Sequence, residues 1–207
     1  MEVTDVIDVN NLKAFVIDNT FNSIDYDKIL HECIFLCNPG KLLPPLKTSS
    51  AVDSDGAPLK SNRALFLTDA YRDPEISDIV NISKKLASKE LFESFSERDY
   101  LYKTYININE ISTLLSYYEK EDFYRPHSDH ATFTMLTWIY QEPKAFKGGD
   151  LILNYKDRIE CKNNRSLIFP SFIRHEVTPV EMEEEKLNQK LGRFTISQFF
   201  HINPNHR

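Results

Sequence analysis

Apolar residues recur at helical spacing in two stretches of the first half of the chain. Residues 24–37 place Ile29, Cys33 and Cys37 on one face, and the following Asn-Pro-Gly turn predicts the end of the helix. Residues 74–95 repeat this spacing and begin with a proline, which favours a first helical turn. Residues 42–57, rich in Pro, Ser, Asp and Gly, are predicted to form a loop.

The apolar period changes after Lys103. Short runs of alternating or continuous apolar residues, separated by turn-forming residues, predict antiparallel strands that pack as a sandwich or jelly roll. The predicted strands span residues 105–109, 114–118, 132–140, 151–155, 166–169 and 194–200. Helices followed by a run of strands indicate an α+β fold overall.

Length and composition favour one globular domain over residues 1–207. The chain has 41% hydrophobic and 27% charged residues, and it divides into a helix-rich part over 1–100 and a strand-rich part over 101–203. A net charge of −6 disfavours nucleic acid as a partner. No apolar run is long enough to span a membrane. An acidic N-terminus and three scattered cysteines lead us to expect a cytoplasmic protein.

Three residues of the strand-rich half could bind one metal ion. His127 and Asp129 leave the same face of an extended segment, and His175 follows another apolar strand that a barrel-like sheet can bring back to them. Two imidazoles and one carboxylate suit a non-haem Fe(II) centre with open coordination positions. The alternatives are a chance His-x-Asp pair in a polar loop and a surface histidine.

Arg193 opens the last predicted strand. It shares one face with Thr195 and Ser197, while Phe194 and Ile196 share the other. An inward arginine requires an anionic partner because an unpaired buried charge is costly, and a co-substrate carboxylate is one candidate. The alternative is a strand-end arginine paired with a nearby glutamate.

Four motifs in this order resemble the Fe(II)- and 2-oxoglutarate-dependent dioxygenases, most closely their prolyl 4-hydroxylase-like branch. They are Tyr124-Arg-Pro-His-Ser-Asp129, Gly148-Gly-Asp-Leu151, His175-Glu-Val-Thr-Pro-Val180 and Arg193-Phe-Thr-Ile-Ser197, and the resemblance covers roughly residues 114–200. The charged segment 181–191 departs from it, since this branch has a shorter link there. We expect a solvated loop, with a substrate contact as the alternative.

The resemblance implies a double-stranded β-helix (jelly roll) core with N-terminal supporting helices, in which residues 101–203 form the catalytic core and residues 1–100 a support and candidate lid. It also implies roles for individual residues. His127, Asp129 and His175 correspond to the iron ligands, and Arg193 to the residue that binds the distal carboxylate of 2-oxoglutarate. Thr195 is expected to assist it. Tyr117 stands where the branch often has a tyrosine that hydrogen-bonds the same co-substrate, with Tyr118 and Tyr124 as nearby alternatives. Trp138 stands where the branch often has another tyrosine.

The resemblance also implies the activity. Fe(II), 2-oxoglutarate and O2, with ascorbate as a further expected cofactor, would support hydroxylation of an unactivated C–H bond with release of succinate and CO2. A prolyl residue in a protein or peptide is the favoured substrate. A free amino acid or other small molecule is the alternative, as is a non-enzymatic metal-binding jelly-roll module. Because both histidines must be neutral to bind metal, iron affinity is expected to weaken below about pH 6.

Overall fold

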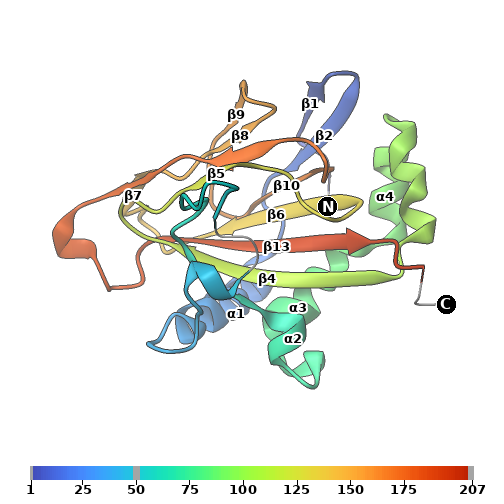
Figure 1. Ribbon diagram of the computed structural model, residues 1–207. Coiled ribbons are helices and arrows are strands. Elements are labelled where there is room, and N and C mark those ends of the chain that lie inside the picture. Colours follow the sequence, from blue (N-terminus) through green and yellow to red (C-terminus); the bar gives the residue numbers. More distant parts are fainter. Residues whose placement is uncertain (1, 49–51, 205–207) are drawn as a thin grey trace.

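Two antiparallel sheets and a set of helices form three layers (Figure 1). The computed structural model describes residues 2–48 and 52–204, so part of the predicted loop over 42–57 lies outside the described residues. Within them, a seven-stranded sheet has the order β1-β2-β10-β6-β13-β4-β3, and a four-stranded sheet has the order β5-β11-β8-β9. Strands β12 and β7 form a separate pair. The predicted α+β fold with a jelly-roll core and supporting helices is confirmed.

The elements have the following bounds. The large sheet contains β1 (Asp5–Val9), β2 (Leu12–Ile17), β3 (Arg63–Phe66), β4 (Glu110–Tyr118), β6 (Phe133–Ile139), β10 (Arg165–Pro170) and β13 (Arg193–His201). The other strands are β5 (Tyr124–His127), β7 (Phe146–Gly148), β8 (Leu151–Leu153), β9 (Asp157–Ile159), β11 (His175–Val177) and β12 (Val180–Met182). The α-helices are α1 (Ser23–Leu36), α2 (Leu67–Ala70), α3 (Asp78–Ser83) and α4 (Lys89–Ser96). The 3-10 helices are η1 (Pro45–Lys47), η2 (Pro74–Ile76), η3 (Lys84–Ala87), η4 (Tyr100–Asn107) and η5 (Glu184–Lys186).

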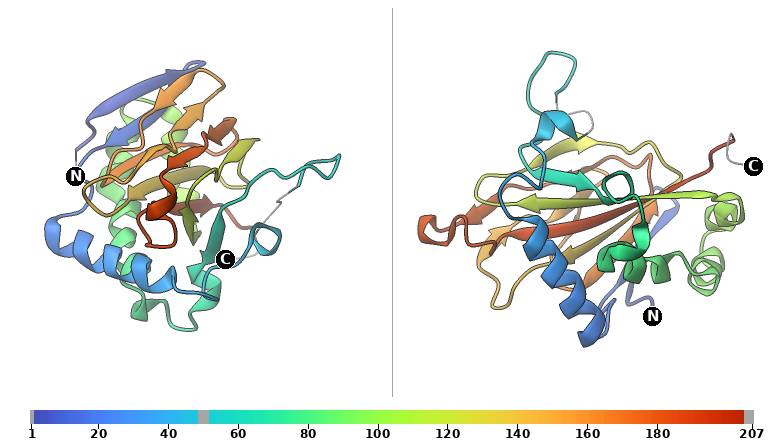
Figure 2. Two further views of the ribbon diagram at one scale, coloured as in Figure 1. Left: turned by 90° about the vertical axis from the view of Figure 1, so that its left-hand side faces the viewer. Right: turned by 90° about the horizontal axis from the view of Figure 1, so that it is seen from below.

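The large sheet separates two apolar clusters. Helices α1, α2 and α3 lie on one side of it and the small sheet lies on the other, as three views show (Figures 1 and 2). Side chains from α1, α3 and α4 pack with Phe194 and Ile196 in the first cluster. Leu136, Leu153 and Val177 belong to the second, between the sheets. No helix among the described residues is long and apolar enough to cross a membrane.

The first predicted helix is confirmed, and the second is wrong as a single element. Asn22 caps α1 by accepting a hydrogen bond from the Asp25 backbone N–H at 2.9 Å. Within residues 74–95 the chain instead forms η2, α3, η3 and all of α4 except its last residue. Ser77 and Ser88 each accept from a backbone N–H three residues later and begin a new helix. The extended conformation of Ser88 interrupts the helical periodicity.

The strand predicted over residues 105–109 is also wrong. Most of that segment belongs to η4, whose first turn is capped by the Asp99 carboxylate. Tyr102, fully buried in η4, stacks on Phe133 of β6 with ring centroids 4.5 Å apart. This aromatic packing determines the local conformation, because tertiary contacts outweigh a short β-favouring sequence.

Strand β13 is an interior strand of the large sheet, and its two faces lie in different environments. It pairs with β4 on one side and with β6 on the other. Phe194 and Ile196 are buried towards the helices, as predicted. Arg193 and Thr195 face the cavity between the sheets. Alternation along this one strand therefore presents polar groups to the interior of the jelly roll.

Candidate active site

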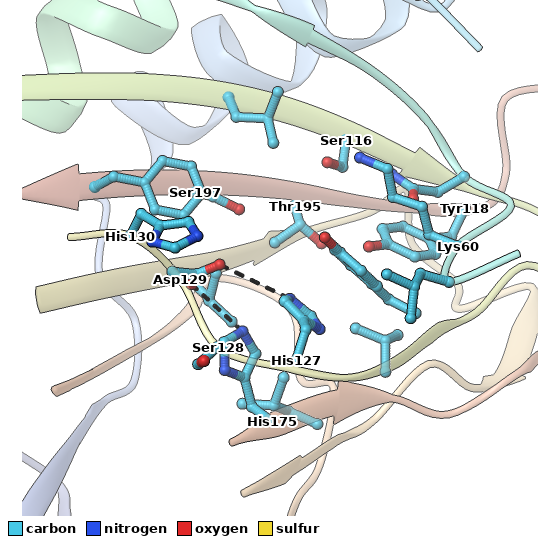
Figure 3. Close-up of a pocket in the computed structure, with 18 of the residues that line it drawn as sticks. Lys60, Ser116, Tyr118, His127, Ser128, Asp129, His130, His175, Thr195 and Ser197 are labelled. Carbon is cyan, nitrogen blue, oxygen red and sulfur yellow. Dashed lines mark ion pairs between the residues drawn. The ribbon is translucent and has the colours of Figure 1, made fainter. Parts of the chain in front are cut away.

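Strands β5 and β11 bring the two histidines of the sequence motif together. His127, at the end of β5, pairs in register with His175, at the start of β11. Their ring centroids are 4.2 Å apart. Asp129 follows β5 by two residues, and its backbone N–H donates to the Ser171 carbonyl at 3.0 Å. One atom from each of the three side chains falls within 4.8 Å of the others (Figure 3).

Hydrogen bonds orient both rings for metal binding. His127 Nδ1 lies 2.8 Å from the Arg125 carbonyl, and His175 Nδ1 lies 3.0 Å from the Ile173 carbonyl. A carbonyl oxygen only accepts, so each Nδ1 carries the proton and each Nε2 keeps its lone pair. Imidazole ligands in metalloproteins are commonly fixed in this way. The two Nε2 atoms face Asp129, at 3.8 Å from Oδ1 for His127 and 3.4 Å from Oδ2 for His175.

The Asp129 carboxylate is held by a neighbouring hydroxyl. Thr134 Oγ1 donates to Asp129 Oδ2 at 2.7 Å, and the Ser171 hydroxyl lies 2.8 Å from the same Thr134 oxygen. Both hydroxyls are buried at the interface of β6 and β10. The carboxylate is therefore presented at a fixed angle to the two rings, which suits two-nitrogen, one-oxygen coordination of a transition metal.

Burial changes the proton affinity of His127. Desolvation, followed by the charge of His175, lowers the pKa of His127 to about 3. The ring therefore stays neutral at pH values where an exposed histidine is protonated. For this ring, the loss of metal affinity expected below about pH 6 moves to lower pH.

The lowered pKa predicts a pH dependence of stability in the metal-free protein. Between about pH 6.5 and pH 3 the unfolded chain takes up a proton at His127 that the folded chain does not bind. The free energy of unfolding should therefore decrease as pH falls through this window. Denaturant unfolding at stepped pH would measure the slope, and His127→Gln should flatten it. Identical slopes for the variant and the parent would contradict the prediction.

A cavity of about 280 Å³ opens beside the three residues. Its lining includes Arg193, Thr195, Tyr118, Leu136 and Lys60. In Figure 3, Thr195 and Ser197 extend from β13 towards the triad, while Lys60 and Tyr118 lie on the opposite side from His130. The cavity thus joins the candidate metal ligands to the polar face of β13.

Arg193 is fully buried at one wall of this cavity. Its guanidinium carbon lies 4.6 Å from the centroid of the Tyr118 ring and 5.8 Å from that of Trp138. Across the described chain, none of its three guanidinium nitrogens finds a hydrogen-bond partner, nor does the buried Thr195 hydroxyl. A buried cation with unused donors is suited to an anionic ligand, because leaving it unpaired is costly.

The two adjacent tyrosines of β4 face opposite sides of the sheet. Tyr118 lines the cavity, and burial raises the pKa of its hydroxyl even though Arg193 lies beside it. Tyr117 is buried in the cluster that faces the helices, and its hydroxyl bonds to Gly192 and Glu119. The structure therefore brings His127, Asp129, His175, Arg193 and Thr195 around one cavity but does not bring Tyr117 to it.

Sequence reasoning missed Lys60 as a cavity residue. Its side chain is 3% exposed, and its ammonium donates to the Thr48 carbonyl and lies 5.3 Å from the Tyr124 ring centroid. The segment around it runs beside β5, where the Arg125 N–H donates to the Leu59 carbonyl at 2.7 Å. Desolvation lowers the pKa of Lys60 to about 8. Its sequence context, a polar loop, gives no signal for this position.

The second half of the chain matches a known family. Residues 113–201 match the model of the 2OG-Fe(II) oxygenase superfamily. The match covers less than half of the chain. It supports a 2-oxoglutarate-dependent dioxygenase, and the family implies Fe(II), 2-oxoglutarate and O2 as reactants and cofactors. No curated protein matches the chain significantly.

Solved structures share the fold at low sequence identity. A prolyl-4-hydroxylase from Pseudomonas putida matches with a TM-score of 0.62 and 14% identity, over 91% of this chain and 92% of its own. A Trichoplax adhaerens prolyl hydroxylase was solved in complex with a hypoxia inducible factor oxygen degradation domain peptide fragment. It matches with a TM-score of 0.57 and 15% identity, over 91% of this chain and 83% of its own. A viral collagen prolyl hydroxylase from Paramecium Bursaria Chlorella virus-1, in a 2OG complex, matches with a TM-score of 0.54 and 14% identity, over 90% of this chain and 94% of its own. The chain therefore shares its fold with these prolyl hydroxylases.

Proposed function

We propose that this dioxygenase hydroxylates an unactivated C–H bond of a prolyl residue in a protein or peptide and releases succinate and CO2. In this proposal His127, Asp129 and His175 bind Fe(II), and Arg193 binds the distal carboxylate of 2-oxoglutarate. The whole chain acts as one domain, in which residues 101–203 carry the chemistry and residues 1–100 support it. We expect it to act in the cytoplasm, with ascorbate maintaining the iron.

One observation carries the assignment of the co-substrate site. The unpartnered guanidinium of Arg193 and the oriented Nε2 atoms of both histidines line the same cavity. A dicarboxylate keto acid has a chelating end for the metal and an anionic end for the arginine. The keto acid would therefore share the metal ion with the two Nε2 atoms at one end and pair with the guanidinium at the other.

The side chains of the site have separable tasks. The bound iron and keto acid supply the oxidising chemistry. The Nδ1–carbonyl bonds and the Thr134 hydroxyl keep the three ligands in place, while Arg193 and Thr195 would orient the co-substrate from β13. Leu136, Leu151 and Val177 line the cavity with apolar surface. This surface limits the access of water to a reactive oxidant.

We assign the co-substrate role expected of Tyr117 to Tyr118. Tyr118 lies in the cavity beside the guanidinium of Arg193, and its hydroxyl stays protonated because burial raises its pKa. A protonated phenol can donate a hydrogen bond to a carboxylate. Tyr124 is a second cavity residue, but its ring is stacked on His127 with centroids 3.5 Å apart, which suits it to position the metal ligand.

The peptide substrate is the finer part of the proposal. The fold is shared with prolyl hydroxylases, one of which was solved with a peptide. The segment around Lys60 runs beside β5 above the cavity and could serve as a lid over an extended peptide. A free amino acid or other small molecule remains the second candidate, favoured by the modest volume of the cavity, about 280 Å³.

Two measurements separate these candidates. Succinate release from 2-oxoglutarate with Fe(II) and ascorbate should be stimulated by the true substrate. Mass spectrometry should then show a gain of one oxygen atom in a proline-containing peptide. Stimulation by free proline or another small molecule, with every peptide inert, would exclude the peptide assignment. Absence of both succinate and product with all substrates would contradict the reaction itself.

A further inference from the structure

A chain of hydrogen bonds ends one residue before Arg193. The Gly192 backbone N–H donates to the Tyr117 hydroxyl at 3.1 Å, and that hydroxyl donates to Glu119 Oε1 at 2.9 Å. The same carboxylate oxygen accepts the backbone N–H of Asn188 at 2.8 Å. Glu119 thus joins the end of β4 to the charged segment 181–191 that distinguishes this chain. We refer to Tyr117, Glu119 and these two backbone groups as the clamp.

The clamp holds Gly192 tightly against β4. A Cβ at Gly192 would lie 2.2 Å from the Tyr118 carbonyl oxygen and 3.0 Å from the Tyr117 hydroxyl, so no larger residue fits without movement. Arg63 also packs on this tyrosine, with its guanidinium carbon 5.4 Å from the ring centroid. The backbone that enters β13 is therefore fixed immediately before the arginine.

The stem of Arg193 is confined as well. A Cβ added at Gly149 would lie 2.9 Å from Arg193 Cδ, so the arginine passes close over a bare glycine backbone. Its guanidinium then lies against the Tyr118 ring at 4.6 Å. With the backbone and stem both restrained, the distance from the guanidinium to the metal triad has little freedom. That distance decides which length of dicarboxylate can reach both ends.

We propose that Tyr117 and Glu119 are positioning residues that set the depth at which Arg193 binds the distal carboxylate of 2-oxoglutarate. The inference rests on the proposed role of Arg193 and extends it to residues that do not touch the cavity. The inference also assigns a structural role to the charged segment 181–191, because the Asn188 N–H of this segment donates to Glu119 and so completes the clamp. The tyrosine found on the wrong face for a direct contact acts through the backbone instead.

Binding to the Mn(II)-loaded protein tests the inference without turnover. Trp138, the only tryptophan of the chain, lies 5.8 Å from the Arg193 guanidinium carbon and should report ligand binding by its fluorescence. Tyr117→Phe removes one hydroxyl that serves two hydrogen bonds. We expect the Kd for 2-oxoglutarate to rise about three- to tenfold, the range that corresponds to one or two lost hydrogen bonds. The preference for 2-oxoglutarate over 2-oxoadipate should fall by about threefold, and Mn(II) affinity should stay unchanged.

Further variants separate positioning from general stability. Glu119→Ala should reproduce the effect of Tyr117→Phe, whereas Glu119→Gln keeps an accepting oxygen and should bind within about twofold of the parent. Tyr102→Phe is the matched control, since its fully buried hydroxyl donates to the Lys13 carbonyl at 2.8 Å in the cluster beside the helices. It should lower the melting temperature and leave both keto acid affinities unchanged.

Two outcomes would overturn the inference. Tyr117→Phe and Glu119→Ala could lose stability as Tyr102→Phe does, yet bind both keto acids as the parent does. The weakened binding could instead extend equally to both keto acids, without loss of selectivity. Arg193→Met distinguishes failure of the proposed function. If Arg193→Met binds 2-oxoglutarate poorly while Tyr117→Phe and Glu119→Ala bind it as the parent does, only the positioning role of the clamp is wrong. If Arg193→Met binds 2-oxoglutarate as the parent does, the proposed co-substrate site itself is wrong.

Discussion

Asp129→Ala should abolish stoichiometric binding of Fe(II) or Mn(II) at micromolar metal. Asp129 supplies the only carboxylate of the His127, Asp129 and His175 group, and its oxygens face both Nε2 atoms. Loss of a residue that merely supports a ligand costs about 10- to 100-fold in metal affinity, so loss of the ligand itself should cost at least about 100-fold. Calorimetric titration of the metal-free protein with Mn(II) measures this directly, and 2-oxoglutarate binding should weaken with it.

Two further variants should lower metal affinity less than Asp129→Ala does, or not at all. Thr134→Val removes the hydroxyl that donates to Asp129 Oδ2 at 2.7 Å and should lower metal affinity by about 10- to 100-fold. Glu176→Ala removes a carboxylate next to His175 in β11 and should leave metal affinity unchanged. Circular dichroism would confirm that each variant is folded. Unchanged Mn(II) stoichiometry and affinity in Asp129→Ala would reject the triad.

The sequence predicted the longer strands of the large sheet after residue 110, including β13, but it did not predict the short strands β5 and β11 that carry His127 and His175. Alternation over 194–200 was sufficient because one face packs against helices and the other lines a cavity. Strands β1 and β2 were missed, although Asn10 and Asn11 between them adopt positive φ angles of 52° and 68° and form a two-residue hairpin turn. Their place in the sheet depends on the pairing of β2 with β10, far along the chain. No local pattern encodes that pairing.

Some residues of the candidate site could likewise be predicted from the sequence, and others could not. The motif was sufficient to group His127, Asp129 and His175, and the structure pairs His175 with His127 although the register of β11 against β5 shifts after that pair. The choice between Tyr117 and Tyr118 depends on which face of β4 points inward, and a register change of one residue reverses it. Lys60 reaches the cavity from a segment whose path is set by backbone hydrogen bonds to β5. Such a path follows from tertiary structure alone.

Arg193→Met should have opposite effects on ligand binding and on stability. Loss of the guanidinium should weaken 2-oxoglutarate binding by roughly 3–5 kcal/mol, or about two to three and a half decades, because the carboxylate would be buried without its partner. In the ligand-free protein the same guanidinium is fully buried, and its nitrogens make no hydrogen bond to any described residue. Replacing such a charge with an apolar side chain of similar volume is neutral or stabilising, by up to roughly 4 kcal/mol. The Tyr118 and Trp138 rings offset part of this gain, by about 1–2 kcal/mol.

Arg165→Met is the matched control for this pair of effects. Arg165 Nε donates to Asp18 Oδ1 at 2.6 Å, and its NH2 group donates to Asp18 Oδ2 at 3.1 Å, so its charge is already satisfied. Its removal should destabilise the protein, by roughly 1 kcal/mol at this partly exposed position, and leave 2-oxoglutarate binding unchanged. Thermal unfolding of the ligand-free proteins should therefore place Arg193→Met at or above the parent and Arg165→Met below it. A loss of stability in Arg193→Met as large as that in Arg165→Met would mean that the guanidinium supports the fold, and a change in 2-oxoglutarate affinity below about threefold would remove Arg193 from the co-substrate site.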